Sequence, residues 1–236
     1  MSQKSKIEWT ESSWNPVTGC TKISAGCSNC YAATFAKRLK AMGNKRYINQ
    51  FDVTIHEDLI ERPLSWKKPQ MIFVNSMSDL FHESIPDEIV KAIFNTMNKA
   101  SWHTFQVLTK RAERLVELSP QLVWTQNIWM GVSVEDAQSI TRCQLLKQTP
   151  AMIKFVSAEP LIERLESINL NGIHWLIVGG ESGHRCRPMD KAWALELRDK
   201  AIESNTAFFF KQWGGVHKAK NGSLLDGLEY KEYPIL

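Results

Sequence analysis

Six short, almost uninterrupted apolar runs constrain the fold of this chain more than any other feature. Each contains four or five residues, as in the runs 71–74 (MIFV) and 175–178 (WLIV). A strand with one face in water alternates apolar and polar residues, whereas a strand covered on both faces is apolar throughout. The sequence therefore predicts a sheet buried on both sides, with strands at 71–74, 105–108, 128–132, 152–156, 175–178 and 207–210.

Helical patterns lie between these runs. In the clearest one, Ile89, Ile93 and Met97 recur at helical spacing, and Ser84 stands three residues before Asp87, which is capping-box spacing. Similar patterns cover 31–42, where Gly43 is placed to stop the helix, 134–147 and 190–204. Strands that alternate with helices indicate βα units and a parallel sheet.

The number of strands decides whether such a sheet closes into a barrel. Two weaker strand patterns, at 7–9 and 51–54, would raise the six runs to eight. The sequence thus predicts an α/β fold, a parallel (β/α) barrel that is either partial with six strands or complete with eight. We expect a single domain over residues 1–236, in which 214–236 is a loop or hairpin extension because it contains Asn-Gly and Asp-Gly turn signals.

Composition limits the class of protein and its compartment. The chain has 236 residues, 43% apolar and 23% charged, with a net charge of +4 that permits nucleic acid as a partner without requiring it. The sequence contains no run of 18 apolar residues, so it predicts no membrane span, and its first residues lack the apolar core of a signal peptide. Five cysteines in a chain of this size favour reduced thiols and a cytoplasmic location.

Polar residues follow every apolar run, at the edge where parallel α/β folds bind their ligands. Some of them are expected to be helix caps or solvated loop residues. The sequence Gly179-Gly180-Glu181 follows one run, and its carboxylate could hold an amino group or a ribose hydroxyl; a tight turn is the alternative. The residues that we expect to line a cofactor or substrate pocket are Asn75, Ser76, Ser78, Asp79, Lys110, Glu159 and Glu181.

Three cysteines, Cys20, Cys27 and Cys30, lie within eleven residues of one another and run directly into a predicted helix. Three thiolates can bind a metal centre and leave one coordination position open, as catalytic metals and substrate-binding clusters require. A structural zinc site would need a fourth ligand, for which His184, Cys186 or a distant histidine are candidates. Ordinary buried cysteines are the third possibility.

The cysteine motif resembles that of the radical S-adenosylmethionine superfamily, in particular the phage-associated radical-SAM-like proteins with three cysteines in a Cx6CxxC spacing. The resemblance implies a [4Fe–4S] cluster on Cys20, Cys27 and Cys30 whose open iron binds S-adenosylmethionine. It also implies an external electron donor and the formation of a 5′-deoxyadenosyl radical. The usual motif has three residues in the first gap where this chain has six, and an aromatic residue where this chain has Ser28.

Further positions take roles from this resemblance. Ser76, Ser78 and Asp79 would contact the methionine end of the cofactor, with Lys110 near its carboxylate. The superfamily's Gly-Gly-Glu motif normally follows the second barrel strand, so the late Glu181 cannot be equated with it. Cys186, just past a strand, could return a hydrogen atom to a product radical; a spectator role is the alternative.

Basic and aromatic residues interleave at 37–47 and 211–220. Such segments suit phosphate contacts and base stacking, although a solvated basic surface has the same composition. We therefore expect a radical S-adenosylmethionine enzyme acting on a nucleotide or nucleic acid. The alternative from another class is a non-enzymatic zinc-binding module that contacts nucleic acid.

Overall fold

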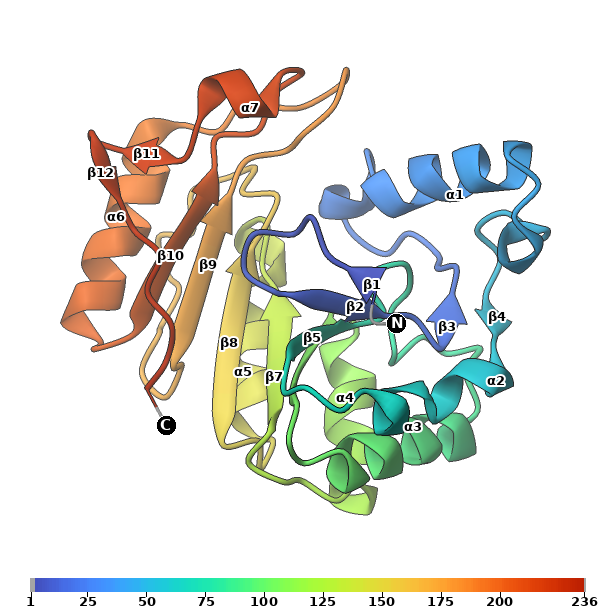
Figure 1. Cartoon of the computed structure of the whole chain (residues 1–236). Coiled ribbons are helices and arrows are strands. Elements are labelled where there is room, and N and C mark those ends of the chain that lie inside the picture. The colour runs from blue at the N-terminus through green and yellow to red at the C-terminus, as the bar shows by residue number, and fades with distance from the viewer. Residues whose placement is uncertain (1–2, 236) are drawn as a thin grey trace.

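The computed structural model describes residues 3–235, so residues 1, 2 and 236 of the predicted domain lie outside it. An eight-stranded sheet forms its centre, with the strand order β1-β2-β5-β6-β7-β8-β9-β10. β1 is antiparallel to β2, and the other neighbours are all parallel, which gives seven parallel strands. The sheet curls into a half barrel flanked by helices (Figure 1). The predicted partial (β/α) barrel is confirmed, with one parallel strand more than the six apolar runs supply.

The strands of this sheet are β1 (Gln3–Lys4), β2 (Ser12–Trp14), β5 (Met71–Val74), β6 (Thr104–Thr109), β7 (Ile128–Ser133), β8 (Ile153–Ala158), β9 (Trp175–Gly179) and β10 (Ala207–Gln212). Each of the six predicted runs is a strand, extended by one or two residues in most cases. Two small antiparallel pairs stand apart from the sheet, namely β3 (Val17–Thr18) with β4 (Thr54–Ile55), and β11 (Leu224–Leu225) with β12 (Leu228–Glu229).

Helices cover the convex face of the sheet (Figure 1). α3 (Asp87–Lys99), α4 (Ala112–Leu118) and α5 (Thr141–Lys147) follow β5, β6 and β7, and α6 (Lys191–Glu203) connects β9 to β10. Val90, Ile93 and Phe94 of α3 are buried against the outward side chains of the strands, as the spacing predicts. The capping box at Ser84 does not form, because Pro86 is the N-cap of α3 and makes no side-chain cap bond.

The remaining helices are short or lie away from the convex face. They are α1 (Tyr31–Ala41), α2 (Glu57–Ile60), α7 (Lys218–Asn221) and the 3₁₀ turns η1 (Ala25–Cys27), η2 (Lys45–Tyr47), η3 (Arg62–Ser65), η4 (Ser119–Gln121) and η5 (Ala137–Ser139). The predicted helix at 134–147 is therefore split, because the side chain of Asp136 caps η5 and only 141–147 is α-helical. None of the helices in the described residues is long and apolar enough to cross a membrane.

The two weak strand predictions, 7–9 and 51–54, are wrong. β2 at 12–14 is the first parallel strand, and Thr54 belongs to the small pair with β3. The segment around Trp9 instead crosses the concave face of the sheet, in front of β7 and β8 (Figure 1). The Trp9 ring packs 4.7 Å from the Phe73 ring and 6.2 Å from the Trp175 ring, measured between centroids. The apolar residues at 7–9 thus fill the inside of the half barrel rather than extend its sheet.

The C-terminal tail covers the edge of the sheet at β10. The amide of Phe210 donates to the carbonyl of Tyr230, and the amide of Glu232 donates to the carbonyl of Phe208. The predicted Asp-Gly turn joins β11 to β12, with positive φ at Asp226 and Gly227 as a tight hairpin requires. An edge strand with free backbone groups invites pairing with other chains, so the tail and β1 protect the two sides of the sheet.

Candidate cofactor site

The three cysteines lie in a loop over the carboxyl ends of the parallel strands. Residues 19–30, here called the cysteine loop, lead from β3 into α1, with Cys27 closing η1 and Cys30 as the N-cap of α1. All three thiols are free and partly exposed. A helix N-terminus favours negative charge, so the position of Cys30 suits a thiolate ligand.

The segment that follows β5 holds one side of the cysteine loop. The amide of Gly19 donates to the carbonyl of Met77 at 2.9 Å, and the hydroxyl of Ser78 donates to the carbonyl of Gly19 at 2.7 Å. The hydroxyl of Tyr31 donates to the carbonyl of Ser76 at 2.6 Å. The predicted pocket residues Ser76 and Ser78 therefore lie beside the cysteines, and the Ser78 hydroxyl is used to hold the loop.

Arg111, at the end of β6, ties Cys20 to the carboxylates around it. Its Nη1 lies 3.5 Å from the sulfur of Cys20 and 3.3 Å from Oδ2 of Asp79, and its Nε lies 2.7 Å from Oε2 of Glu83. Asp79 also accepts from the hydroxyl of Thr109 at 2.7 Å and from the amide of Lys110 at 3.0 Å. Both carboxylate oxygens of Asp79 are thus engaged, which makes it a positioning residue for Arg111 and the β6 end.

Glu135, after β7, contacts the middle of the cysteine loop. It is fully buried, accepts a hydrogen bond from the hydroxyl of Ser24, and lies 2.8 Å from Nη1 of Arg142 and 3.5 Å from Nζ of Lys110. A Cβ on Gly26 would come within 2.6 Å of Oε1 of Glu135. The loop therefore packs so closely here that any larger residue at position 26 would have to displace the Glu135 side chain.

The loop that follows β9 completes the ring of contacts. The side-chain amide nitrogen of Asn29, Nδ2, donates to Oε2 of Glu181 at 3.0 Å and to the carbonyl of Arg185 at 2.8 Å. Arg187 holds the same carboxylate through its Nε at 2.9 Å and its Nη2 at 2.5 Å. Burial raises the pKa of Glu181, but the bonds from Arg187 and Asn29 outweigh it and lower that pKa. Cys186 is partly exposed on this loop, beside the cysteine loop.

Cys20 and Cys27 differ in how readily they ionise. Burial raises the pKa of Cys20 to about 11, together with the negative charge of Asp79, although Arg111 opposes both. Burial also raises the pKa of Cys27. The hydrogen bonds from the backbone of Ile23 and from Ser24, together with the charge of Lys110, outweigh burial, so the net shift of this pKa is downward. The negative charge of the Cys27 thiolate also contributes to the raised pKa of Cys20.

Two further groups, Glu159 and Asn75, lie at the strand ends. Glu159 accepts a hydrogen bond from Nε1 of Trp9 at 3.3 Å and pairs with Nζ of Lys211 at 2.9 Å, so it links the segment around Trp9 on the concave face to β10. Asn75 is 2% exposed and its amide nitrogen has no hydrogen-bond partner in the described chain. A buried donor without a partner costs free energy, and a ligand oxygen would satisfy it.

The site thus brings together the residues that the sequence singled out, and it adds others. Three of the added residues follow predicted strands in the sequence, namely Arg111, Glu135 and Lys211. Nothing in their spacing indicated that Arg111 pairs with Asp79, that Glu135 contacts the cysteine loop or that Lys211 pairs with Glu159. The other three, Ser24, Asn29 and Arg187, had no signal in the sequence. Ser24 and Asn29 contact residues more than a hundred positions away, and Arg187 meets Glu181 only through the fold of their shared loop.

A preformed site for a single metal ion is not found among the described residues. Over residues 3–235, no three His, Cys, Asp or Glu side chains converge on a point where one ion could bind. A zinc site needs such convergence, whereas the cysteines of an iron–sulfur cluster each ligate a different iron and only surround the cluster. The free thiols, the cations at Cys20 and Cys27, and the unpaired Asn75 amide fit a cluster with a ligand beside it.

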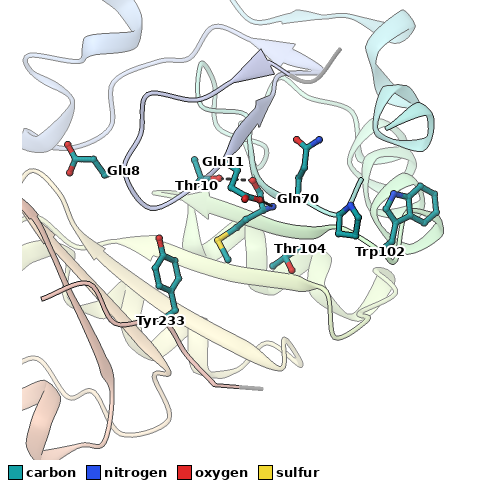
Figure 2. A pocket seen from close by; sticks show the side chains of 9 residues that line it. Glu8, Thr10, Glu11, Gln70, Trp102, Thr104 and Tyr233 are labelled. Carbon is teal, nitrogen blue, oxygen red and sulfur yellow. Dashed lines mark hydrogen bonds between the residues drawn. The ribbon is translucent and has the colours of Figure 1, made fainter. Parts of the chain in front are cut away.

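A hollow of about 450 Å³ lies elsewhere, at the amino ends of β5 and β6. Figure 2 shows Glu8, Thr10 and Glu11 of the N-terminal segment on one side, with Trp102, Thr104 and Tyr233 around it. Burial and the charge of Glu11 raise the pKa of Tyr233. The hollow contains none of the predicted pocket residues, so it is separate from the cysteine loop.

The fold and the site together define a partial (β/α) barrel with a three-cysteine loop across its mouth. The family described as "Protein of unknown function (DUF5131)" matches residues 4–234, and the chain belongs to it. A comparison with curated proteins finds no match.

Among solved structures, the chain is similar to a cysteine-to-serine mutant of spore photoproduct lyase, with a TM-score of 0.51 and 12% identity over 86% of this chain and 75% of that one. It is also similar to spore photoproduct lyase complexed with dinucleoside spore photoproduct, with a TM-score of 0.49 and 11% identity over 86% of this chain. The chain spans 64% of the length of that second structure. A further mutant of the lyase, with bound AdoMet and the dinucleoside, has a TM-score of 0.47 and 10% identity over 86% of this chain and 64% of that one. The first of these similarities shows a shared fold.

Proposed function

We propose that the protein is a radical S-adenosylmethionine enzyme that acts on a nucleotide or nucleic acid. The observation that carries the proposal is the cysteine loop, which places three free thiols over the carboxyl ends of the strands and is held there by four different strand ends. Parallel α/β folds bind their ligands at this edge. The Cx6CxxC motif that resembles the phage-associated variants thus lies where a cofactor would be bound.

Cys20, Cys27 and Cys30 would hold a [4Fe–4S] cluster. Arg111 lies beside the sulfur of Cys20, and Lys110 lowers the pKa of Cys27, so two cations compensate the charge of the thiolates. When bound, the cluster would supply one electron from an external donor to the sulfonium of S-adenosylmethionine, which releases the 5′-deoxyadenosyl radical. Free cysteines throughout the chain match a reducing, cytoplasmic setting.

The protein's own residues would bind and orient the cofactor. The unpaired amide of Asn75 can donate to a ligand oxygen, and Lys110 offers a positive charge to a carboxylate. Ser76, Ser78 and Asp79 support this region by fixing the cysteine loop and Arg111. Glu181 accepts strong bonds from Arg187 here, so it would receive an amino group only if Arg187 moves.

The substrate class follows from two observations. Basic and aromatic residues interleave in the segments beside the mouth of the barrel. Spore photoproduct lyase, whose fold the chain shares, is solved with a dinucleoside as its ligand. Cys186 lies on the loop beside the cysteine loop, where a thiol could return a hydrogen atom to a product radical.

The test is anaerobic reconstitution with iron and sulfide, followed by reduction in the presence of S-adenosylmethionine. We expect a brown protein with about four irons and four sulfides that forms 5′-deoxyadenosine. Alanine at any of the three motif cysteines removes the iron, whereas Cys143→Ala, a change in the buried core, leaves it in place. Normal iron and sulfide in Cys27→Ala, or stoichiometric zinc in place of iron, would overturn the assignment.

A further inference from the structure

Helix α1 is built the opposite way from an ordinary surface helix. It buries small residues, since Ala32 and Ala36 are 4% and 0% exposed against Met77 and Tyr47. It exposes aromatic ones, since Tyr31 is 57% exposed and Phe35 is 48% exposed. A surface helix normally turns its large apolar residues to the core, and a contiguous exposed apolar surface is characteristic of a binding site.

The exposed residues form a stripe. Tyr31, Phe35, Arg38 and Met42 stand at positions i, i+4, i+7 and i+11, which share one face of a helix. Tyr31 begins the stripe at the mouth of the barrel, where its hydroxyl donates to the carbonyl of Ser76. At 1.5 Å per residue, the stripe extends roughly 16 Å away from the mouth.

The charge of the chain is concentrated around this stripe. The segment 12–51 contains six of the 29 basic residues and none of the 25 acidic ones, so the rest of the chain has 23 basic and 25 acidic residues. The whole positive excess of the protein therefore lies in the forty residues that include the cysteine loop and α1. Folding does not require the basic residues to gather in one segment, because like charges that lie close together repel one another and destabilise the folded chain.

These cations are available to a partner. In the part of the chain that the structure describes, Lys37, Arg38, Lys40 and Lys45 make no ion pair, whereas Arg46 is engaged by Asp58 at 2.6 Å. Cations near the C-terminus of a helix are favoured by its dipole, which accounts for Arg38 and Lys40 but not for the exposed rings. Tyr47, an aromatic residue of the basic segment, is buried and cannot take part.

We propose that this face, the α1 stripe with Lys37, Arg38, Lys40 and Lys45, docks single-stranded nucleic acid and leads one nucleotide into the mouth of the barrel. Unpaired bases stack on exposed aromatic rings while cations follow the phosphates. The inference rests on the proposed function only in naming the substrate's path. An acidic protein, such as an electron donor, would match the charge, but the two rings one helical turn apart favour bases.

The experiment measures binding of a fluorescein-labelled, mixed-sequence 20-nucleotide single strand, as DNA and as RNA, to the full-length reconstituted protein by fluorescence anisotropy over a range of salt. K37A/R38A should weaken binding and reduce the slope of log Kd against log salt by roughly 1.4, about 0.7 per lost phosphate contact. K67A/K68A is the matched control, because it removes two exposed lysines ahead of the amino end of β5 and should leave the slope unchanged.

The aromatic part has its own variants. Phe35→Ala should weaken binding roughly tenfold through lost stacking, and Phe35→Trp should retain it. The proposal is overturned if the wild type does not bind the strand, or if K37A/R38A and Phe35→Ala bind as tightly as K67A/K68A. If they bind normally but are reduced more slowly by an acidic electron-donor protein, the face docks a protein instead.

Iron content and 5′-deoxyadenosine formation, measured on the same samples, separate this proposal from the function above. Failure to load iron with binding still sensitive to K37A/R38A would reject the enzyme and keep the docking face. Normal iron loading and cofactor cleavage, with nucleic-acid binding that no variant changes, would keep the enzyme and reject the docking face.

Discussion

The guanidinium of Arg111 lies 3.5 Å from the sulfur of Cys20 and 3.3 Å from the carboxylate of Asp79. It therefore connects a thiol to an acidic residue that would otherwise repel its ionised form. Burial and Asp79 still raise the pKa of Cys20 to about 11, so in the metal-free protein this thiol is protonated at neutral pH. Cys27, whose pKa is lowered, is the more readily ionised of the two.

This difference predicts the order in which the two thiols react. Because only the thiolate is a nucleophile, iodoacetamide should modify Cys27 faster than Cys20 in metal-free protein at neutral pH. The rate at Cys27 should level off below pH 9, its ordinary pKa, while the rate at Cys20 continues to rise toward pH 11. Mass spectrometry of the peptides at each pH measures both rates.

Arg111→Gln provides the internal control for that experiment. Without the guanidinium, the pKa of Cys20 should rise further and its alkylation at a given pH should slow, while Cys27 is unaffected. Cys20 reacting first at neutral pH, or reacting faster in Arg111→Gln, would contradict the assignment of charges at this site.

Gly26→Ala tests whether the cysteine loop must sit close to Glu135. A Cβ at position 26 would lie 2.6 Å from Oε1 of Glu135, in a carboxylate that is held by Arg142 and cannot retreat freely. We expect iron loading to fall severalfold after reconstitution, with thermal stability changed by only a few degrees. Gly172→Asn is the control, since it stands in open space at a positive φ that asparagine tolerates. Full iron content in Gly26→Ala would show that the loop is not fixed there.

Asn75→Asp tests the unpaired amide at the end of β5. The change keeps the oxygen that accepts from the amide of Val17 at 3.3 Å and suits the positive φ of 57° at this position. It replaces a donor by a negative charge, so the affinity for S-adenosylmethionine should fall at least about tenfold if a ligand oxygen binds there. Equilibrium dialysis with reconstituted protein measures it, and Asn169→Asp, on an exposed loop, is the control. Unchanged affinity would remove Asn75 from the site.

The strands could be predicted wherever burial on both faces requires a continuous run of apolar residues. The six central strands are covered on both sides, so their residues are apolar and the pattern shows them. β2 escaped prediction because two of its three residues are serines, and its burial comes from lying between β1 and β5. The segment around Trp9 gave a strand-like pattern for a different reason, namely that its apolar side chains fill the concave face.

The sequence predicted that several polar residues gather at one edge of the sheet, but it did not predict which of them pair with one another. The rule that ligands bind at the carboxyl ends of parallel strands pointed to Asp79, Lys110, Glu159 and Glu181, and these residues do surround the cysteine loop or line the mouth. Which of them is free to bind a ligand depends on the partner that each one has in the folded chain. Arg187 engages Glu181, Lys211 pairs with Glu159, and Arg111 with two neighbours saturates Asp79. The pairs of Lys211 with Glu159 and of Arg111 with Asp79 form between segments that only the folded sheet brings together, whereas Arg187 and Glu181 meet through the fold of one loop.

Trp9→Ala tests whether the segment around Trp9, which was expected to be a strand, fills the inside of the half barrel. Trp9 is 2% exposed and contacts Phe73, Phe155 and Trp175, so its removal leaves a large cavity on the concave face. A truncation of this kind costs about 3–5 kcal/mol, which corresponds to a fall in Tm of roughly 6–20 °C for a chain of this length. Thermal unfolding followed by circular dichroism measures the change.

Trp9→Phe separates packing from the polar contact. It keeps most of the ring volume and removes only the bond from Nε1 to Glu159, so the loss of stability should be about 1 kcal/mol. Trp102→Ala, at a ring that is 41% exposed, is the control for removing a tryptophan outside the core, and its effect should be well below that of Trp9→Ala. If Trp9→Ala and Trp102→Ala unfold at the same temperature, the segment 5–11 does not fill the barrel, and its bond from Trp9 to Glu159 does not help to hold the concave face together.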